Sequence, residues 1–201
     1  MLLASWLATN AGLKRIFTSG LEHSGINFRC KLASMRVMGI DCGSEYTGFG
    51  VVEEMADRKL VCHITGAIKL KSSLSMAAKL QKIFSDLTAI IAEHQPAIVA
   101  IEDVFYALNV KTALKLGQVR GVAMLAASAS GLQVAEYSPL SIKSAVVGYG
   151  RAEKHQVQQM VMRLLNLAVA PEPMDASDAL AIAICHIHTA ATNSRYQAAS
   201  R

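Results

Sequence analysis

The chain has 201 residues, 52% of them hydrophobic, and a formal net charge of +5 at pH 7. This is enough apolar sequence for one sizeable core, and no linker rich in Pro, Gly or Ser divides the chain. No uninterrupted apolar stretch approaches the length of a membrane span, so we expect no membrane association. The four cysteines lack the paired C-x-x-C spacing of zinc ribbons and redox motifs, which favours a reducing, cytoplasmic location.

The first 34 residues differ in composition from the rest. Most of the basic excess of the chain lies there, and it follows the apolar start of the chain instead of preceding it, unlike a secretory signal. An organellar transit peptide would fit this composition as well. We expect residues 1–34 to be a disordered extension, or to precede the true start at Met35. Residues 35–192 are then the folded domain, and residues 193–201 a flexible tail.

From Met35 onward, the apolar pattern predicts alternating strands and helices. Strands are expected at 36–42, 47–54 and 59–70 as an antiparallel meander, and further strands at 97–102 and 132–136. Helices are expected at 75–94, 109–128, 139–147, 153–166 and 175–191, from apolar spacing and from capping residues. This order predicts an α/β fold with a five-stranded mixed sheet and helices on both faces.

Four carboxylates are placed so that they could converge on one site. Asp41 and Glu102 end two apolar strands, where an ionised group must reach water, pair with a cation or bind a metal. Asp175 and Asp178 lie three residues apart in the first turn of the last predicted helix, so they share a face. Considered alone, this pair is better explained as a helix cap. As a set of four, the carboxylates favour Mg²⁺ and a phosphate-bearing substrate over zinc.

Gly117 and Gly121 lie one turn apart in the helix predicted at 109–128. Each costs about 1 kcal/mol relative to alanine inside a helix, so we expect a close neighbour on that side. A strand of the sheet or a partner subunit could be this neighbour. We favour packing against the sheet for one face of the helix, and a contribution to a dimer surface for the rest.

Over residues 36–188, the order of these elements and motifs resembles the RuvC family of Holliday-junction resolvases, which have a ribonuclease H-like fold. The stretches that carry the resemblance are 39–44, 47–50, 101–105, 113–121, 146–148, 152–154 and 175–183. One position departs from the family pattern, because Cys42 stands where the first motif usually has proline. This replacement is expected to loosen the turn after Asp41 and to leave the carboxylate intact.

The resemblance implies a homodimeric crossover junction endodeoxyribonuclease that acts in recombination and repair. It would bind a four-way DNA junction, nick two strands of like polarity symmetrically, and work with the RuvA–RuvB branch-migration complex. Asp41, Glu102, Asp175 and Asp178 would hold two Mg²⁺ ions, with Mn²⁺ as a possible substitute, for phosphodiester hydrolysis. Lys143 and Lys154 match basic positions that the family places near the scissile phosphate.

Other residues are weaker candidates for DNA contacts. Lys111, Lys115 and Arg151 could bind the phosphate backbone if the basic residues gather on one face. Phe105 and Tyr106 follow the strand that ends in Glu102, where an aromatic ring could either stack on an unpaired base or pack into the core.

Two other functions stay open from the sequence. One is a non-catalytic protein that binds junctions through the same fold. The other is a different ribonuclease H-like nuclease that acts on RNA or flap substrates, because a fold does not determine a substrate. The presence of all four acids argues against the first alternative, and only the long match over 113–121 separates the resolvase from the second.

Overall fold

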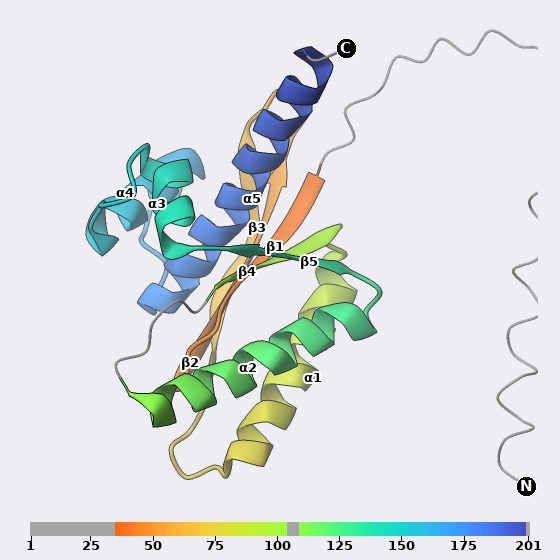
Figure 1. The fold of residues 1–201 in the computed structure, drawn as a ribbon, viewed down its shortest axis with the longest axis vertical. Coiled ribbons are helices and arrows are strands. Elements are labelled where there is room, and N and C mark those ends of the chain that lie inside the picture. The colour runs from red at the N-terminus through yellow and green to blue at the C-terminus, as the bar shows by residue number, and fades with distance from the viewer. Residues whose placement is uncertain (1–34, 104–108, 200–201) are drawn as a thin grey trace, which may run out of the picture. The chain divides into compact units, whose positions relative to one another are not determined.

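A five-stranded mixed sheet forms the centre of the fold, of which the computed structural model describes residues 35–103 and 109–199 (Figure 1). The strands are β1 (Met35–Asp41), β2 (Tyr46–Glu54), β3 (Leu60–Lys69), β4 (Ile98–Glu102) and β5 (Gln133–Tyr137). Their order in the sheet is β3-β2-β1-β4-β5. β1, β2 and β3 pair antiparallel, whereas β4 runs parallel to both β1 and β5. The predicted mixed sheet is confirmed.

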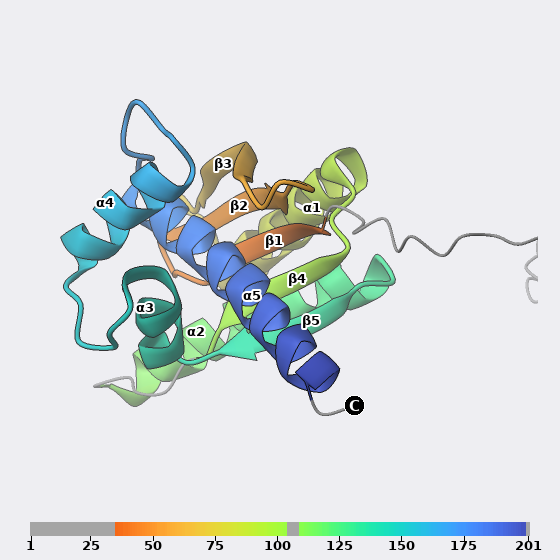
Figure 2. The same cartoon turned by 90° about the horizontal axis from the view of Figure 1, so that it is seen from above.

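Five helices cover both faces of this sheet (Figure 2). They are α1 (Met76–His94), α2 (Val110–Ala129), α3 (Pro139–Val147), α4 (Lys154–Leu164) and α5 (Met174–Ala199). Successive residues of a strand point to opposite faces, so β1 contributes to two separate cores. Val37 packs with α3, α4 and α5, whereas Met38 and Ile40 pack with α1 and α2. The predicted helices on both faces are therefore confirmed.

The backbone of α5 lies directly on β1 and β2. A Cβ atom added at Gly39 would overlap the carbonyl oxygen of Ala179, and one added at Gly48 would overlap the carbonyl oxygen of Asp175. Only glycine permits this close approach. The first turns of α5 are consequently held against the two strands that meet beside Asp41.

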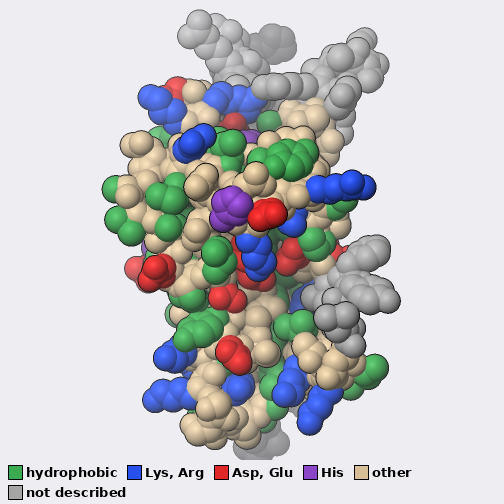
Figure 3. Space-filling model, turned by 90° about the vertical axis from the view of Figure 1, so that its left-hand side faces the viewer, with side chains coloured by type: hydrophobic (Ala, Val, Ile, Leu, Met, Phe, Trp, Pro, Cys, Tyr) green, Lys and Arg blue, Asp and Glu red, His purple; other side chains and the backbone are tan. Residues whose placement is uncertain are grey.

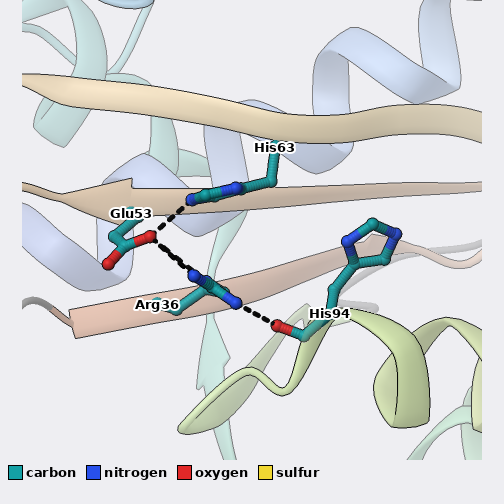
Figure 4. A network of polar contacts seen from close by, with 4 residues as sticks. All are labelled: Arg36, Glu53, His63 and His94. Atoms are coloured by element: carbon teal, nitrogen blue, oxygen red, sulfur yellow. Dashed lines mark hydrogen bonds and ion pairs between the residues drawn. The ribbon is translucent and has the colours of Figure 1, made fainter.

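Polar contacts join three strands and α1 at the opposite end of β1 (Figure 4). The Arg36 guanidinium donates to Glu53 on β2, with Nη2 2.9 Å from Oε2, and to the carbonyl oxygen of His94 at the end of α1. His63 on β3 contacts the same Glu53 oxygen. The buried Glu53 carboxylate therefore has a cationic partner on a neighbouring strand.

Two details differ from the sequence prediction. The last helix does not end near Ala191 but continues to Ala199, so residues 193–199 of the expected tail are helical. The residues after Ala191 include neither Gly nor Pro to stop the helix. Gly117 and Gly121 do not pack against the sheet, since no other described segment comes within 4 Å of a Cβ atom placed at either residue.

Among the described residues, no helix combines the length and the apolar character needed to cross a membrane.

Candidate active site

The strand pairing places Asp41 and Glu102 side by side. β1 and β4 are parallel, and Ile40 pairs with Ile101, so the next residue of each strand emerges at the same end of the sheet. The two-residue alternation also gives both carboxylates the same face. Val37 and Ala100 belong to the core under α5, and Asp41 and Glu102 follow them by four and two residues. The sequence of the two strands thus directs both acids toward α5.

The first turns of α5 bring the other two acids to this end of the sheet. Thr65 on β3 donates a hydrogen bond to the carbonyl oxygen of Ala176 over 3.2 Å, which ties the start of α5 to the sheet. Thr47 on β2 donates to the carbonyl oxygen of Gly43 and so holds the loop that follows Asp41. Sequence reasoning did not find these two threonines, because their roles depend on contacts between distant segments.

Three of the four carboxylates and two lysines line one cavity of about 230 Å³. Its polar lining residues are Asp41, Glu102, Asp178, Lys143 and Lys154, and its apolar wall consists of Pro139, Ile142, Val157, Ala181 and Ile182. Asp175 is not part of this lining. Its Oδ1 atom would lie 3.2 Å from a Cβ atom at Gly43, so its carboxylate borders the loop after β1. The structure therefore brings all four predicted acids close together, three of them in one cavity.

The acids are short of positive charge. Burial and the negative charges of Asp178, Glu102 and Asp175 raise the pKa of Asp41 from 3.8 to about 7, against the lowering effect of Lys154. Burial and then the charge of Asp178 raise the pKa of Glu102, against the effects of Lys154 and Lys143. The two lysines therefore offset only part of the effect of burial and of the repulsion among the acids.

Short helices hold the two lysines over the cavity. Lys154 is the first residue of α4, which begins with a capping box between Glu153 and Gln156. Its Nζ atom lies 3.1 Å from Oδ2 of Asp178, and this negative charge is the main cause that raises the pKa of Lys154. Lys143 belongs to α3, which is capped by Ser138. On the face formed by α3 and α4, acidic side chains gather across the middle with basic ones among them (Figure 3).

The donor set suits a hard divalent cation, although the present geometry is not a finished coordination shell. Within residues 35–103 and 109–199, no three Asp, Glu, His or Cys side chains are arranged to hold a metal ion as they stand. The Lys154 ammonium pairs with Asp178, and Asp175 faces Gly43. A cluster of carboxylate oxygens with an Asp41 pKa of about 7 nonetheless has the chemistry that favours a cation. The Lys154 ammonium supplies part of this positive charge through its ion pair with Asp178.

Arg120 on α2, which lies within the matched stretch 113–121, is a positioning residue whose role its sequence context does not predict. Its Nε donates to the carbonyl oxygen of Glu102 over 3.3 Å, and its Nη2 forms ion pairs with Asp103 and Glu136. These contacts hold the end of β4 against α2 and β5. Cys42 is buried beside Asp41, and burial raises the pKa of its thiol to about 12, so it stays neutral.

The weaker DNA-binding candidates lie elsewhere. Lys111 and Lys115 are exposed on α2, and Arg151 is exposed in the connection between α3 and α4. None of these three lines the carboxylate cavity. Phe105 and Tyr106 lie outside the described residues, so their contacts stay a prediction.

Known proteins share this sequence and fold. The sequence profile of the family described as Crossover junction endodeoxyribonuclease RuvC matches residues 37–186. A protein of that name from Koribacter versatilis is 63% identical over 164 residues, which are 82% of this chain and 99% of the relative. Another, from Acidobacterium capsulatum, is 52% identical over 166 residues, which are 79% of this chain and 96% of the relative.

Two solved structures extend this likeness to three dimensions. The structure of Thermus thermophilus RuvC has a TM-score of 0.73 and 32% identity, and the match covers 79% of this chain and 97% of that chain. A structure of T. thermophilus RuvC in complex with a Holliday junction substrate has a TM-score of 0.72 and 29% identity, with coverage of 79% and 96%.

Proposed function

Because the chain belongs to the RuvC family of crossover junction endodeoxyribonucleases, we propose that the cavity lined by Asp41, Glu102 and Asp178 is its active site. The chain is an endonuclease that resolves Holliday junctions in recombination and repair. Its proposed reaction is the hydrolysis of one phosphodiester bond in each of two strands of like polarity. The observation that carries the site assignment is the cavity in which the half-buried carboxylates of Asp41, Glu102 and Asp178 meet.

The cluster would hold divalent cations, on which nucleases of this family depend. We propose that Mg²⁺, with Mn²⁺ as a substitute, is bound by Asp41, Glu102, Asp175 and Asp178. For this to happen, the Asp175 carboxylate would turn toward the cavity and the Lys154 ammonium would turn away from it. Two ions held there would supply an activated water molecule and would offset the negative charge on the leaving 3′ oxygen. The proposal rests on the oxygen donors and on the raised pKa values of Asp41 and Glu102.

The lysines of the cavity have a separate proposed role. Lys154 reaches the cavity from α4 and pairs with Asp178 at 3.1 Å, a contact that it can exchange for a phosphate oxygen of DNA. Lys143 enters from α3, where its charge lowers the pKa of Glu102. Both ammonium groups would orient the scissile phosphate and offset its charge in the transition state. Residues 35–192 are the proposed nuclease domain.

We propose that the chain forms a homodimer through one side of α2. Val110, Leu114 and Leu125 are 77%, 65% and 57% exposed there, although all three are large and apolar. The open positions at Gly117 and Gly121 lie at helical spacing along the same side. A stripe of apolar and small residues favours close contact with a second copy around a two-fold axis. Such a dimer would present two active sites to one junction.

The dimer can be tested by its solution mass. Leu114→Glu should give a monomer in sedimentation equilibrium, because it would place two charges in the apolar interface. A matched change on the other side of the molecule, Val61→Glu, alters an exposed apolar residue of β3 and should leave the dimer intact. A monomeric unaltered chain would contradict the proposed interface. RuvA–RuvB stays the proposed partner of the assembled enzyme.

Cleavage of a labelled synthetic four-way junction tests the function itself. The full chain should cut paired strands in Mg²⁺ and none in EDTA, and it should leave a linear duplex intact. Binding of the junction without cleavage in any divalent metal would support a non-catalytic junction-binding protein. Cutting of an RNA hybrid or a flap in preference to the junction would support a different nuclease of this fold.

A further inference from the structure

A second cleft lies beside the active site on the other side of the loop that follows Asp41. Its volume is about 610 Å³. The lining residues that matter for its chemistry are Lys69, Lys71, Lys79 and Lys115, together with Ser72 and Ser73. They come from four places: the end of β3, the β3–α1 connection, the first turn of α1, and α2. None of the four lysines lines the carboxylate cavity.

The charge of this cleft is not compensated within the described part of the chain. Three other lysines each have a carboxylate partner, since Lys59 pairs with Asp57, Lys82 with Asp86 and Lys154 with Asp178. None of the four cleft lysines forms such a salt bridge with a described residue. The cleft contains one acidic residue, Glu45, and the ammonium group of Lys69 lies 5.9 Å from the ring centre of Tyr46. Four lysines around a concave surface form a site for anions.

The cleft is attached to the active site through the main chain. Gly43, next to the carboxylate of Asp175, is followed by Ser44, Glu45 and Tyr46, which line the basic cleft. The amide of Leu70 donates to the carbonyl oxygen of Glu45 over 2.8 Å, so the segment that carries Lys69 and Lys71 is tied to this loop. A neighbouring cavity of about 530 Å³ shares these two lysines and continues along β3 and α1. The basic surface therefore extends away from the carboxylates.

We infer that Lys69, Lys71, Lys79 and Lys115 bind the phosphate backbone of a junction arm beyond the scissile phosphate. The inference rests on the proposed function, because the cleft can bind a junction arm only if the DNA has a phosphate at Asp41 and continues across the 43–46 loop. Each strand carries a phosphate about every 3.4 Å of helix axis, so several phosphates lie within reach of a cleft of this size. Lysine acts as a point charge toward phosphate, and the neighbouring serine hydroxyls can donate hydrogen bonds to it.

Junction binding in EDTA, where no strand is cut, tests this inference with the full chain. The variant Lys71→Gln/Lys79→Gln should bind more weakly than the unaltered chain between about 50 and 200 mM KCl, with a salt slope smaller by about 1 to 2 units. A matched control, Arg58→Gln/Lys59→Gln, removes the same charge at two ion-paired residues that line neither cavity and should retain the slope. Lys71→Arg/Lys79→Arg should restore it, because the positive charge returns. Equal salt slopes for the cleft variant and the control, with both folded by circular dichroism, would overturn the inference.

Cleavage separates this cleft from the active site. With the protein in saturating excess over junction, the cleft variant should cut at nearly the unaltered rate, because its carboxylates are unchanged. Asp41→Asn should show the reverse pattern, with retained binding and lost cleavage. Failure of the unaltered chain to cut would count against the proposed function alone, since the binding comparison needs no cleavage. A cleft variant that binds normally but no longer cuts would contradict a role in binding the arm.

Discussion

The two ends of β1 carry charged clusters that differ in their balance of charge. At the start of the strand, Arg36 and His63 surround the buried carboxylate of Glu53. At its end, Asp41 lies among three other acids, and within the described residues Lys154 is the one basic residue that forms an ion pair with any of the four. Glu53 has the partners that burial requires, whereas burial and then the charges of the neighbouring acids raise the pKa of Asp41 to about 7.

The difference separates a structural cluster from a functional one. A buried charge that is paired within its own chain leaves no capacity for a ligand, and removal of one partner then costs stability. A buried group of like charges is unfavourable by itself and is explained when an outside cation completes it. Each cluster includes a carboxylate on a central strand of the sheet, so the presence of such a carboxylate does not identify the active site, whereas the balance of charge around it does.

The largest effect should come from the loss of an acid at the end of β1 or β4. Asp41→Asn and Glu102→Gln are each expected to slow junction cleavage by at least about 10³-fold while junction binding is retained. Glu53→Gln, which removes a carboxylate from the other cluster, should cut at nearly the unaltered rate. Single-turnover cleavage with a mobility-shift assay measures both properties. Equal losses for Asp41→Asn and Glu53→Gln would erase the distinction between the two clusters.

The metal-free protein should become less stable as the pH rises from about 4 to 7. The pKa of Asp41 is about 7 in the folded chain and 3.8 in the unfolded one, so the folded state holds a proton that the unfolded state releases. The resulting loss of unfolding free energy is on the order of 1 to 4 kcal/mol. Thermal unfolding in EDTA at several pH values measures it. Asp41→Asn should flatten this dependence, and Asp57→Asn, at an exposed residue, should not.

Loss of the lysine that balances the acids should reduce cleavage less than loss of an acid. Lys154→Gln is expected to slow the reaction roughly 10²-fold, because the scissile phosphate loses a charged contact. The substitution should also move the pH dependence of metal-free stability to higher pH, since Lys154 lowers the pKa values of Asp41 and Glu102. Lys154→Arg should recover part of the rate. Unchanged cleavage by Lys154→Gln would remove Lys154 from the site.

The smallest effect concerns stability at the paired end of the strand. Glu53→Gln should lower the free energy of unfolding by about 1 to 3 kcal/mol, because Arg36 and His63 lose the negative charge of their shared acceptor. Glu54→Gln, which removes the neighbouring ion pair with Arg58, should cost only about 0.5 kcal/mol. Urea unfolding of the two variants gives the comparison. If both substitutions cost the same, the Glu53 cluster does not hold the sheet together.

Local sequence signals predicted most of the fold. Apolar runs located all five strands, and Ser75, Asn109 and Pro139 marked helix starts that the structure confirms. Asp41 and Glu102 could be paired in advance because each ends an apolar strand. The predicted end of α5 near Ala191 was wrong, because the residues that follow Ala191 permit a helix without favouring one. The close neighbour expected at Gly117 and Gly121 is absent within the described chain.

Other parts of the site depend on contacts that no single segment reveals. Lys69, Lys71, Lys79 and Lys115 are spread over three elements and a connection, and only the folded chain gathers them in one cleft. The sequence does not distinguish Arg120 from the other polar residues of α2, yet its side chain reaches the carbonyl oxygen of Glu102. Spacing along the chain predicts which residues share a face, but not which distant faces meet.

Because α5 packs directly on the backbone of β1 and β2, the position of the acids does not depend on which side chains fill the core. Gly39 and Gly48 leave no side chain between helix and sheet, so main-chain atoms set the distance from Asp175 and Asp178 to Asp41. The core between the sheet and the α1–α2 layer lies on the opposite face. It can therefore be redesigned, for example for heat resistance, with little movement of the acids, whereas a single methyl group at Gly48 would displace them.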